Sequence, residues 1–181
     1  MSKIFKFGCL GIILLVVLLV IVGITGGDDD DNLSTGNNNN SEQKEETKDN
    51  NNGTKTIDAS SQQTTAQGLK IGLGDIRIQE DKIKVGINVE NTTDGKLMFY
   101  PDQGSAVIGD IQLEANMFLT DGDVSGDIMG GVRKEAVLVF TVPEGKELDV
   151  KSVKEIKLML GDVTTEDYMN SKNVTFTIPV E

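Results

Sequence analysis

The chain has 181 residues and a formal net charge of −12, with 17 Lys and Arg against 29 Asp and Glu. This balance argues against nucleic-acid binding, because such proteins need a basic face that releases counterions from phosphates. The chain contains no histidine, which excludes an imidazole base and a His-ligated metal. Its one cysteine, Cys9, leaves no partner for a disulfide bond, and this favours a bacterial surface protein over a eukaryotic secreted module.

Residues 7–25 form an apolar run of 19 residues without a charge. As a helix with a rise of about 1.5 Å per residue, the run spans roughly 28 Å, close to the thickness of the bilayer's hydrocarbon core. Lys3 and Lys6 precede it and Asp28–Asp31 follow it, so the positive-inside rule places its start in the cytoplasm. The sequence therefore predicts a cytoplasmic N-terminus (residues 1–6), one transmembrane helix, and a single-pass cell-membrane protein whose C-terminal domain is extracellular.

This run also permits two other interpretations, a cleaved signal peptide and a lipoprotein. A cleaved signal peptide has an apolar core of about 7–15 residues that ends at small residues. This run is longer and no such site is evident, although Gly26 and Gly27 leave cleavage open. Gly8-Cys9 resembles the end of a lipobox, but a lipobox cysteine follows the apolar stretch and this one precedes it. A lipoprotein is therefore rejected.

Residues 26–67 are predicted to be a disordered polar linker. The segment contains runs of Asp and Asn and many Ser, Thr, Gln and Lys, and its few apolar residues show no period. Such a composition buries too little apolar surface to offset the entropy lost on ordering. As a flexible coil, a segment of this length has a mean reach on the order of 35 Å.

Residues 68–181 alternate between apolar and polar side chains, which is typical of strands with one buried face. The alternation is clearest over 69–78 and 83–89, and Asn91–Gly95 then reads as a turn. Further strands are expected at 97–100, 107–113 with a break near Gly109, 117–119, 136–142, 153–160 and 174–180, with a loop at 162–172 and at most one helical turn within 147–155. This makes seven to nine short strands and predicts an all-β, antiparallel, immunoglobulin-like β-sandwich.

Two stretches resemble a family of Gram-positive bacterial membrane-anchored surface proteins and lipoproteins. They are the strand and turn Val85–Gly95 and the late strand Val137–Pro143. The chain is similar in these stretches, and in its layout of span, tether and sandwich, to the telokin-like, immunoglobulin-fold domains of unknown function. The resemblance covers about residues 69–181 and implies a sandwich fold, but it carries no catalytic residues.

The sharpest local motif is the acidic stretch Asp121, Asp123, Ser125 and Asp127. Oxygen ligands at alternate positions, with Gly126 permitting a sharp turn, match the front half of a calcium-binding EF-hand loop. The back half departs from that pattern, since a valine stands where the bidentate glutamate is needed. A calcium site and an exposed acidic turn therefore both remain open.

The sequence predicts that the protein is not an enzyme. Without histidine, catalysis would need a carboxylate pair, a Ser–Lys pair or a metal, and no Gly-x-Ser-x-Gly motif appears. The expected function is a non-enzymatic interaction module whose partner is a protein or cell-envelope component outside the membrane, and the alternative is a calcium-responsive surface domain. Phe99, Tyr100 and Tyr168 are candidate contact residues, with one of the first two expected in the core.

Overall fold

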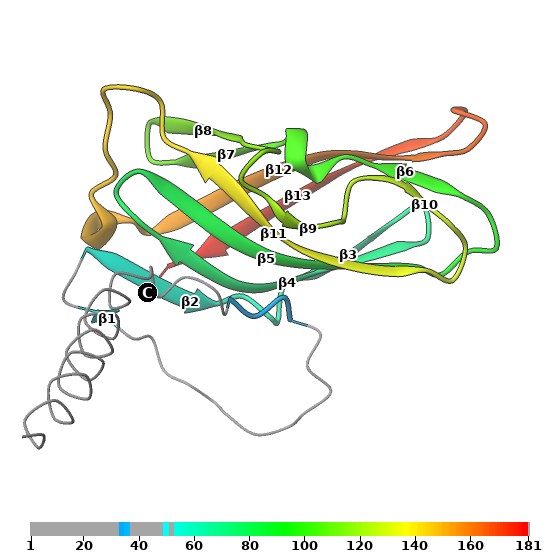
Figure 1. Cartoon of the computed structure of the whole chain (residues 1–181), viewed down its shortest axis with the longest axis horizontal. Coiled ribbons are helices and arrows are strands. Elements are labelled where there is room, and N and C mark those ends of the chain that lie inside the picture. The colour runs from blue at the N-terminus through cyan, green and yellow to red at the C-terminus, as the bar shows by residue number, and fades with distance from the viewer. Residues whose placement is uncertain (1–32, 37–48, 51–52, 181) are drawn as a thin grey trace, which may run out of the picture. The chain divides into compact units, whose positions relative to one another are not determined.

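The computed structural model describes residues 33–36, 49–50 and 53–180 (Figure 1). The predicted cytoplasmic N-terminus and transmembrane helix lie outside the described residues. Within those three ranges, no helix has the length and apolarity that a membrane crossing requires.

The described chain is an antiparallel all-β domain with two short 3-10 helices (Figure 1). Four of its 13 strands have only two or three residues. The elements are β1 (Asp49–Asn50), β2 (Thr54–Asp58), β3 (Gln63–Ala66), β4 (Leu69–Ile78), β5 (Lys82–Asn91), β6 (Leu97–Phe99), η1 (Pro101–Gln103), β7 (Ser105–Ile108), β8 (Ile111–Ala115), β9 (Asp121–Gly122), β10 (Gly126–Ile128), β11 (Arg133–Thr141), η2 (Val150–Ser152), β12 (Glu155–Thr165) and β13 (Ser171–Pro179).

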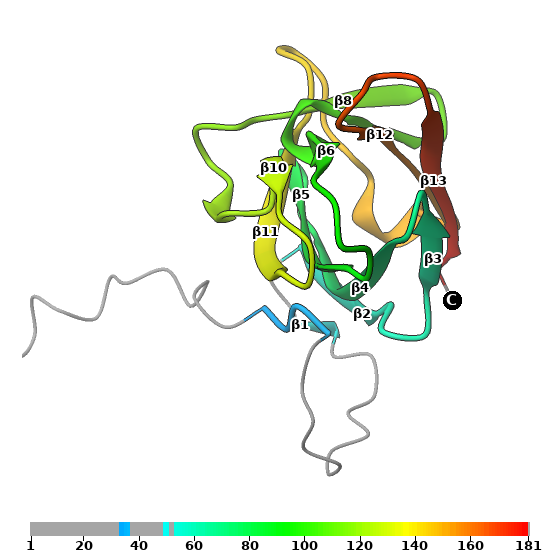
Figure 2. The same cartoon turned by 90° about the vertical axis from the view of Figure 1, so that its right-hand side faces the viewer.

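The strands are hydrogen-bonded in the order β1-β2-β4-β5-β11-β8-β7-β12-β6-β10, with β13 beside β12 and β3 beside β4. The ladder folds back on itself, so β4, β5 and β11 form one layer that faces β12 and β13 across the core (Figure 2). The link between β11 and β8 is short, with only Phe140 and Thr141 paired to β8. This short link marks one corner of the sandwich-like domain.

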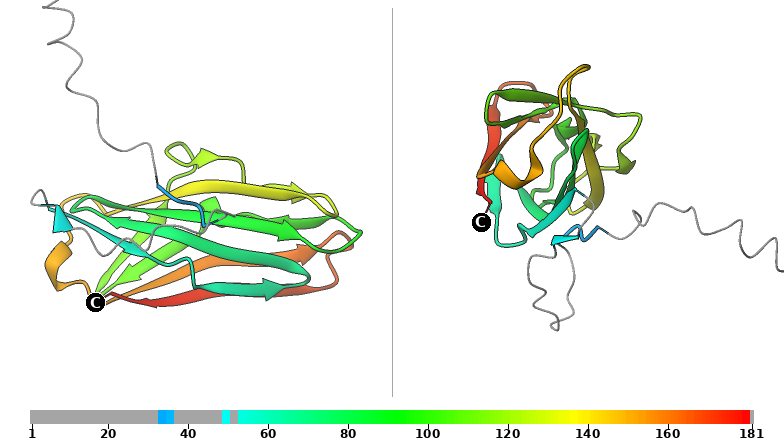
Figure 3. Two further views of the ribbon diagram at one scale, coloured as in Figure 1. Left: turned by 90° about the horizontal axis from the view of Figure 1, so that it is seen from below. Right: turned by 90° about the vertical axis from the view of Figure 1, so that its left-hand side faces the viewer.

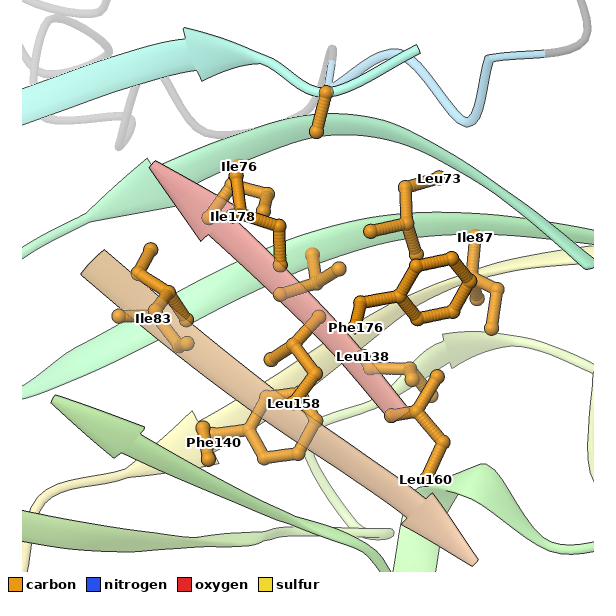
Figure 4. Packing of buried hydrophobic residues seen from close by; sticks show 14 of the residues in the cluster. Leu73, Ile76, Ile83, Ile87, Leu138, Phe140, Leu158, Leu160, Phe176 and Ile178 are labelled. Atoms are coloured by element: carbon orange, nitrogen blue, oxygen red, sulfur yellow. The ribbon is translucent and has the colours of Figure 1, made fainter. Parts of the chain in front are cut away.

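The core lies between these two layers. Ile83, Ile87 and Leu138 come from one layer and meet Leu158 and Phe176 from the other (Figure 4). All five side chains are buried. Successive residues of a strand point to opposite faces of the sheet. The apolar residues of the period-two pattern therefore lie on the face that points into the core.

Most of the predicted strands are confirmed. The apolar positions of 69–78 and 83–89 are buried, and the late strand 136–142 corresponds to β11, with Leu138 and Phe140 in the core. Gly109 has a φ of +60° and separates β7 from β8 at the predicted break. The single expected helical turn within 147–155 is η2.

Three predicted boundaries differ from the structure. The β domain begins before residue 68, because β2 and β3 lie within the range assigned to the linker and pair with β4. Residues 117–119 form a turn instead of a strand, and the predicted loop 162–172 is strand at both ends. The polar residues of β2, β3 and both ends of 162–172 form strands because pairing with another strand overrides local composition. The apolar residues 117–119, by contrast, lie in a turn.

Candidate functional site

The acidic stretch of residues 121–127 connects two different parts of the sheet. Asp121 lies in β9 opposite Val137 of β11, whereas Asp127 lies in β10 opposite Met98 of β6. Only the three residues between them leave the sheet. The two ends are therefore held by strand pairing and do not wrap around a common centre as an EF-hand loop does.

Two of the three carboxylates in this stretch face lysines. The Asp123 Oδ2 atom accepts a hydrogen bond from Lys134 Nζ at 3.0 Å, and Lys134 Nζ also lies 3.4 Å from the Ser125 carbonyl oxygen. The Asp127 Oδ2 atom accepts one from Lys96 Nζ at 3.1 Å, and this bond raises the pKa of the Lys96 ammonium. Each lysine ammonium neutralises a carboxylate charge that would otherwise attract a cation.

Across the described part of the chain, no three Cys, Asp or Glu side chains come together as a group that could hold a metal ion. Asp121, Asp123, Ser125 and Asp127 thus remain neighbours in sequence, and calcium binding there stays a prediction. A bound calcium would have to displace Lys134 and Lys96 from their carboxylates.

The calcium hypothesis predicts that the melting temperature rises in millimolar calcium and that Asp121→Ala removes the rise. Lys134→Ala should enlarge the rise, because it frees the Asp123 carboxylate. Calorimetry with and without calcium measures both effects. An unchanged melting temperature in the wild-type chain would end the hypothesis.

An exposed apolar turn stands directly before the acidic stretch. It consists of Met117, Phe118 and Leu119, which connect β8 to β9, and 90% of the Phe118 surface is exposed. Figure 2 shows the β8–β9 connection standing off the body of the domain. Such large apolar side chains at the surface are typical of contact sites when they are grouped.

The turn is held in one conformation by Asn116. The Asn116 Oδ1 atom accepts a hydrogen bond from the Phe118 N–H at 3.0 Å. Its carbonyl oxygen accepts two more, from the N–H groups of Leu119 and Thr120, each at 3.1 Å. The apolar side chains are thus presented on a pre-organised backbone, which reduces the entropy lost on binding.

The three aromatic residues singled out in the sequence have different positions. Phe99 is fully buried, which confirms that one of the two lies in the core, whereas Tyr100 follows the end of β6 and is half exposed. Tyr168 lies with Met169 at the tip of the β12–β13 hairpin, where 75% of its surface is exposed. The structure does not bring these aromatics into one site.

Sequence reasoning missed Phe118 as a contact candidate, since the apolar run 117–119 suggested a strand. One signal could have identified it. Asn116 precedes the run and Thr120-Asp121-Gly122 follow it, and these residue types favour turns.

A hollow of about 490 Å³ lies between the β7–β8 turn and the segment around η2. Its lining combines Ile108 and Leu148 with charged residues such as Asp110 and Lys154. Ser152 also lines it, and its hydroxyl donates to the carbonyl oxygen of Asp149 at 2.9 Å. That hydroxyl is held by the backbone, so the hollow does not present it to a base as an activated nucleophile.

Comparison with known proteins gives structural neighbours only. No protein-family model matches the sequence, and no curated protein matches it. A functionally unknown protein from Listeria monocytogenes is 13% identical, covers 66% of this chain and 82% of its own, and superposes with a TM-score of 0.47.

Two further solved structures are similar to part of the chain. The ycdA protein of Bacillus subtilis, assigned as a lipoprotein, is 18% identical over 68% of this chain and 39% of its own, with a TM-score of 0.43. The GAE domain of yeast GGA1 is 12% identical over 65% of this chain and 96% of its own, with a TM-score of 0.41. Neighbours at this distance do not identify a function for the chain.

Proposed function

We propose that this protein is a non-enzymatic interaction module, anchored in the cell membrane by residues 7–25 and exposing a telokin-like, immunoglobulin-fold domain on the outer side. The proposed partner is another protein of the cell envelope. The observation that carries the proposal is the turn of Met117, Phe118 and Leu119, in which three large apolar side chains stand exposed on a hydrogen-bonded backbone.

The chemistry of this turn favours a protein partner. Phe and Met are enriched in the centres of protein interfaces, where they fill apolar pockets. The domain around the turn is acidic, which suits a partner with basic residues at the rim of such a pocket. The lack of histidine supports binding without catalysis.

Photocrosslinking in the full-length chain tests the proposal. A photoreactive phenylalanine analogue at position 118 should give one discrete adduct, since this side chain is expected to enter the partner's pocket. The same analogue at Tyr168, an exposed aromatic on the β12–β13 hairpin, is the matched control and should not give that adduct. Gel analysis of membranes after irradiation measures both.

Competition adds specificity to this test. Excess unlabelled wild-type chain should abolish the adduct. The Phe118→Ser chain should need an at least tenfold higher concentration for the same effect, because it loses roughly 2 kcal/mol of binding free energy. Equal competition by both chains, or no adduct from position 118, would contradict the proposed contact.

A further inference from the structure

A short segment of the polar linker lies on the outer surface of the sheet. Residues 33–36 (Leu-Ser-Thr-Gly) cross the face of β4, β5 and β11 that points away from the core (Figure 3). These three strands are neighbours in the sheet. The segment is separated from them by about 40 to 100 residues in sequence, so the contact is tertiary.

Hydrogen bonds tie the segment to each of the three strands. The Asp75 N–H of β4 donates to the Ser34 carbonyl oxygen at 2.9 Å. The Asn88 side-chain amide of β5 donates to the Thr35 carbonyl oxygen at 2.6 Å. The Thr35 hydroxyl donates to Glu135 of β11 at 2.7 Å. Polar groups of all three strands thus contact Ser34 and Thr35.

A β-bulge makes the first of these bonds available. The pairing of β4 with β5 shifts register between Leu73 and Ile76. A bulge leaves a backbone group outside the ladder, and here the Asp75 N–H is directed to Ser34. The Asp75 carboxylate also lies 3.4 Å from the Ser34 nitrogen. The bulge thus supplies two groups to the segment.

Glycines form the floor beneath the segment. A Cβ atom at Gly74 or Gly86 would clash with the Ser34 carbonyl oxygen, and one at Gly72 would press on Asn88. None of these three glycines has a positive φ, so the backbone itself would accept an alanine. The lack of a side chain at Gly74 and Gly86 therefore serves the close approach of the segment and not a turn, and that at Gly72 leaves room for the Asn88 side chain.

From these contacts we propose that Gly74 and Gly86 floor a peptide-binding groove, in which Gly72 leaves room for Asn88, and that its occupant is residues 33–36 of the same chain. The ligand class is a short peptide of the Leu-Ser-Thr-Gly type, read through its backbone carbonyls and one hydroxyl, with its leucine side chain buried. Gly36 ends the occupant with a φ of +81°, a conformation that favours glycine.

On the membrane-anchored chain of the proposed function, on which this consequence alone rests, docking would leave only residues 26–32 between the predicted span and the groove.

Amide hydrogen exchange in the full-length chain, measured by NMR in detergent micelles, tests the groove. The Asp75 amide should be protected in the wild type and exchange at least tenfold faster in Gly74→Ala and Gly86→Ala, since a methyl group displaces the segment. Gly95→Ala is the matched control, because a Cβ there meets nothing within 4 Å. Core amides such as that of Leu158 should keep their protection in all variants, which separates loss of docking from unfolding.

A substitution in the docked segment itself tests the same contact. Gly36→Pro cannot adopt the positive φ and leaves the groove untouched. It should expose the Asp75 amide, and an added peptide of residues 29–40 should restore protection. The peptide should not protect the Gly74→Ala chain.

Three outcomes would overturn the proposal. An unprotected Asp75 amide in the wild type would show an empty groove. Unchanged exchange in both alanine variants would show that docking of the segment does not require the glycines. Protection that vanishes on dilution would assign the groove to the segment of a second copy. Because this readout does not involve Phe118, its failure and that of the proposed function can be told apart.

Discussion

Replacing Asn91 with alanine is expected to lower the free energy of unfolding by about 3 kcal/mol. Asn91 is the one polar side chain that is buried within the described core. Its amide nitrogen donates to the carbonyl oxygens of Gly95 and Ile128 at 2.8 and 2.9 Å. Its Oδ1 atom accepts from the N–H and the hydroxyl of Thr93 at 2.9 and 2.8 Å.

Alanine would leave the buried Ile128 carbonyl oxygen without this donor, which costs more than the hydrogen bond contributes. It would also remove the part-buried bonds to Gly95 and Thr93 that hold the turn. Urea denaturation followed by circular dichroism measures the loss. Asn170→Ala, at an exposed asparagine in the β12–β13 turn, is the control and should change the free energy by less than about 0.5 kcal/mol.

Asn91→Asp separates hydrogen bonding from side-chain shape. The carboxylate cannot donate to the Gly95 and Ile128 carbonyl oxygens, so the variant should be at least as unstable as Asn91→Ala at neutral pH. Protonation restores one donor, so stability should partly recover as the pH is lowered. A fully stable Asn91→Ala chain would contradict the anchoring role of this residue.

The second large effect is expected for Phe140→Ala, with a loss of about 4 kcal/mol in the free energy of unfolding. The Phe140 ring is fully buried and lies against Leu158 of the opposite layer (Figure 4). Truncation removes apolar surface from the core and leaves a cavity between the two layers. The same denaturation experiment measures this loss.

Phe118→Ala is the matched control for this substitution. The chemical change is identical, but Phe118 is almost fully exposed and should alter the free energy by less than about 0.5 kcal/mol. A comparable loss in both variants would mean that the turn of residues 117–119 packs on the domain, which would also weaken its role as a contact site.

The class of fold and most of the core could be predicted from the sequence. In β4, β5 and β12, each apolar residue of the alternating pattern is buried, because the period of a strand is a local property. The start of the domain could not be predicted, since β2 and β3 are polar segments. They are strands because β4 offers them hydrogen-bonding partners on its free edge.

The candidate sites were less accessible to sequence reasoning. Asp123 and Asp127 read as cation ligands because their lysine partners, Lys134 and Lys96, are distant along the chain. Phe118 read as strand because its exposure depends on Asn116 turning the backbone away from the sheet. Local composition describes a residue's chemistry but not which groups surround it.

What the sequence by itself determined is the alternation that makes the described domain all-β, the turn that begins at Asn91, and the charge and apolar pattern that predict one membrane span. Only the tertiary structure decided that Asn91 is buried, that the carboxylates of the acidic stretch face lysines, and that glycines of β4 and β5 lie under residues 33–36. The physical reason is the distance along the sequence over which each effect acts. Period and charge act between neighbours in sequence, whereas burial, pairing and close approach depend on residues that only folding brings together.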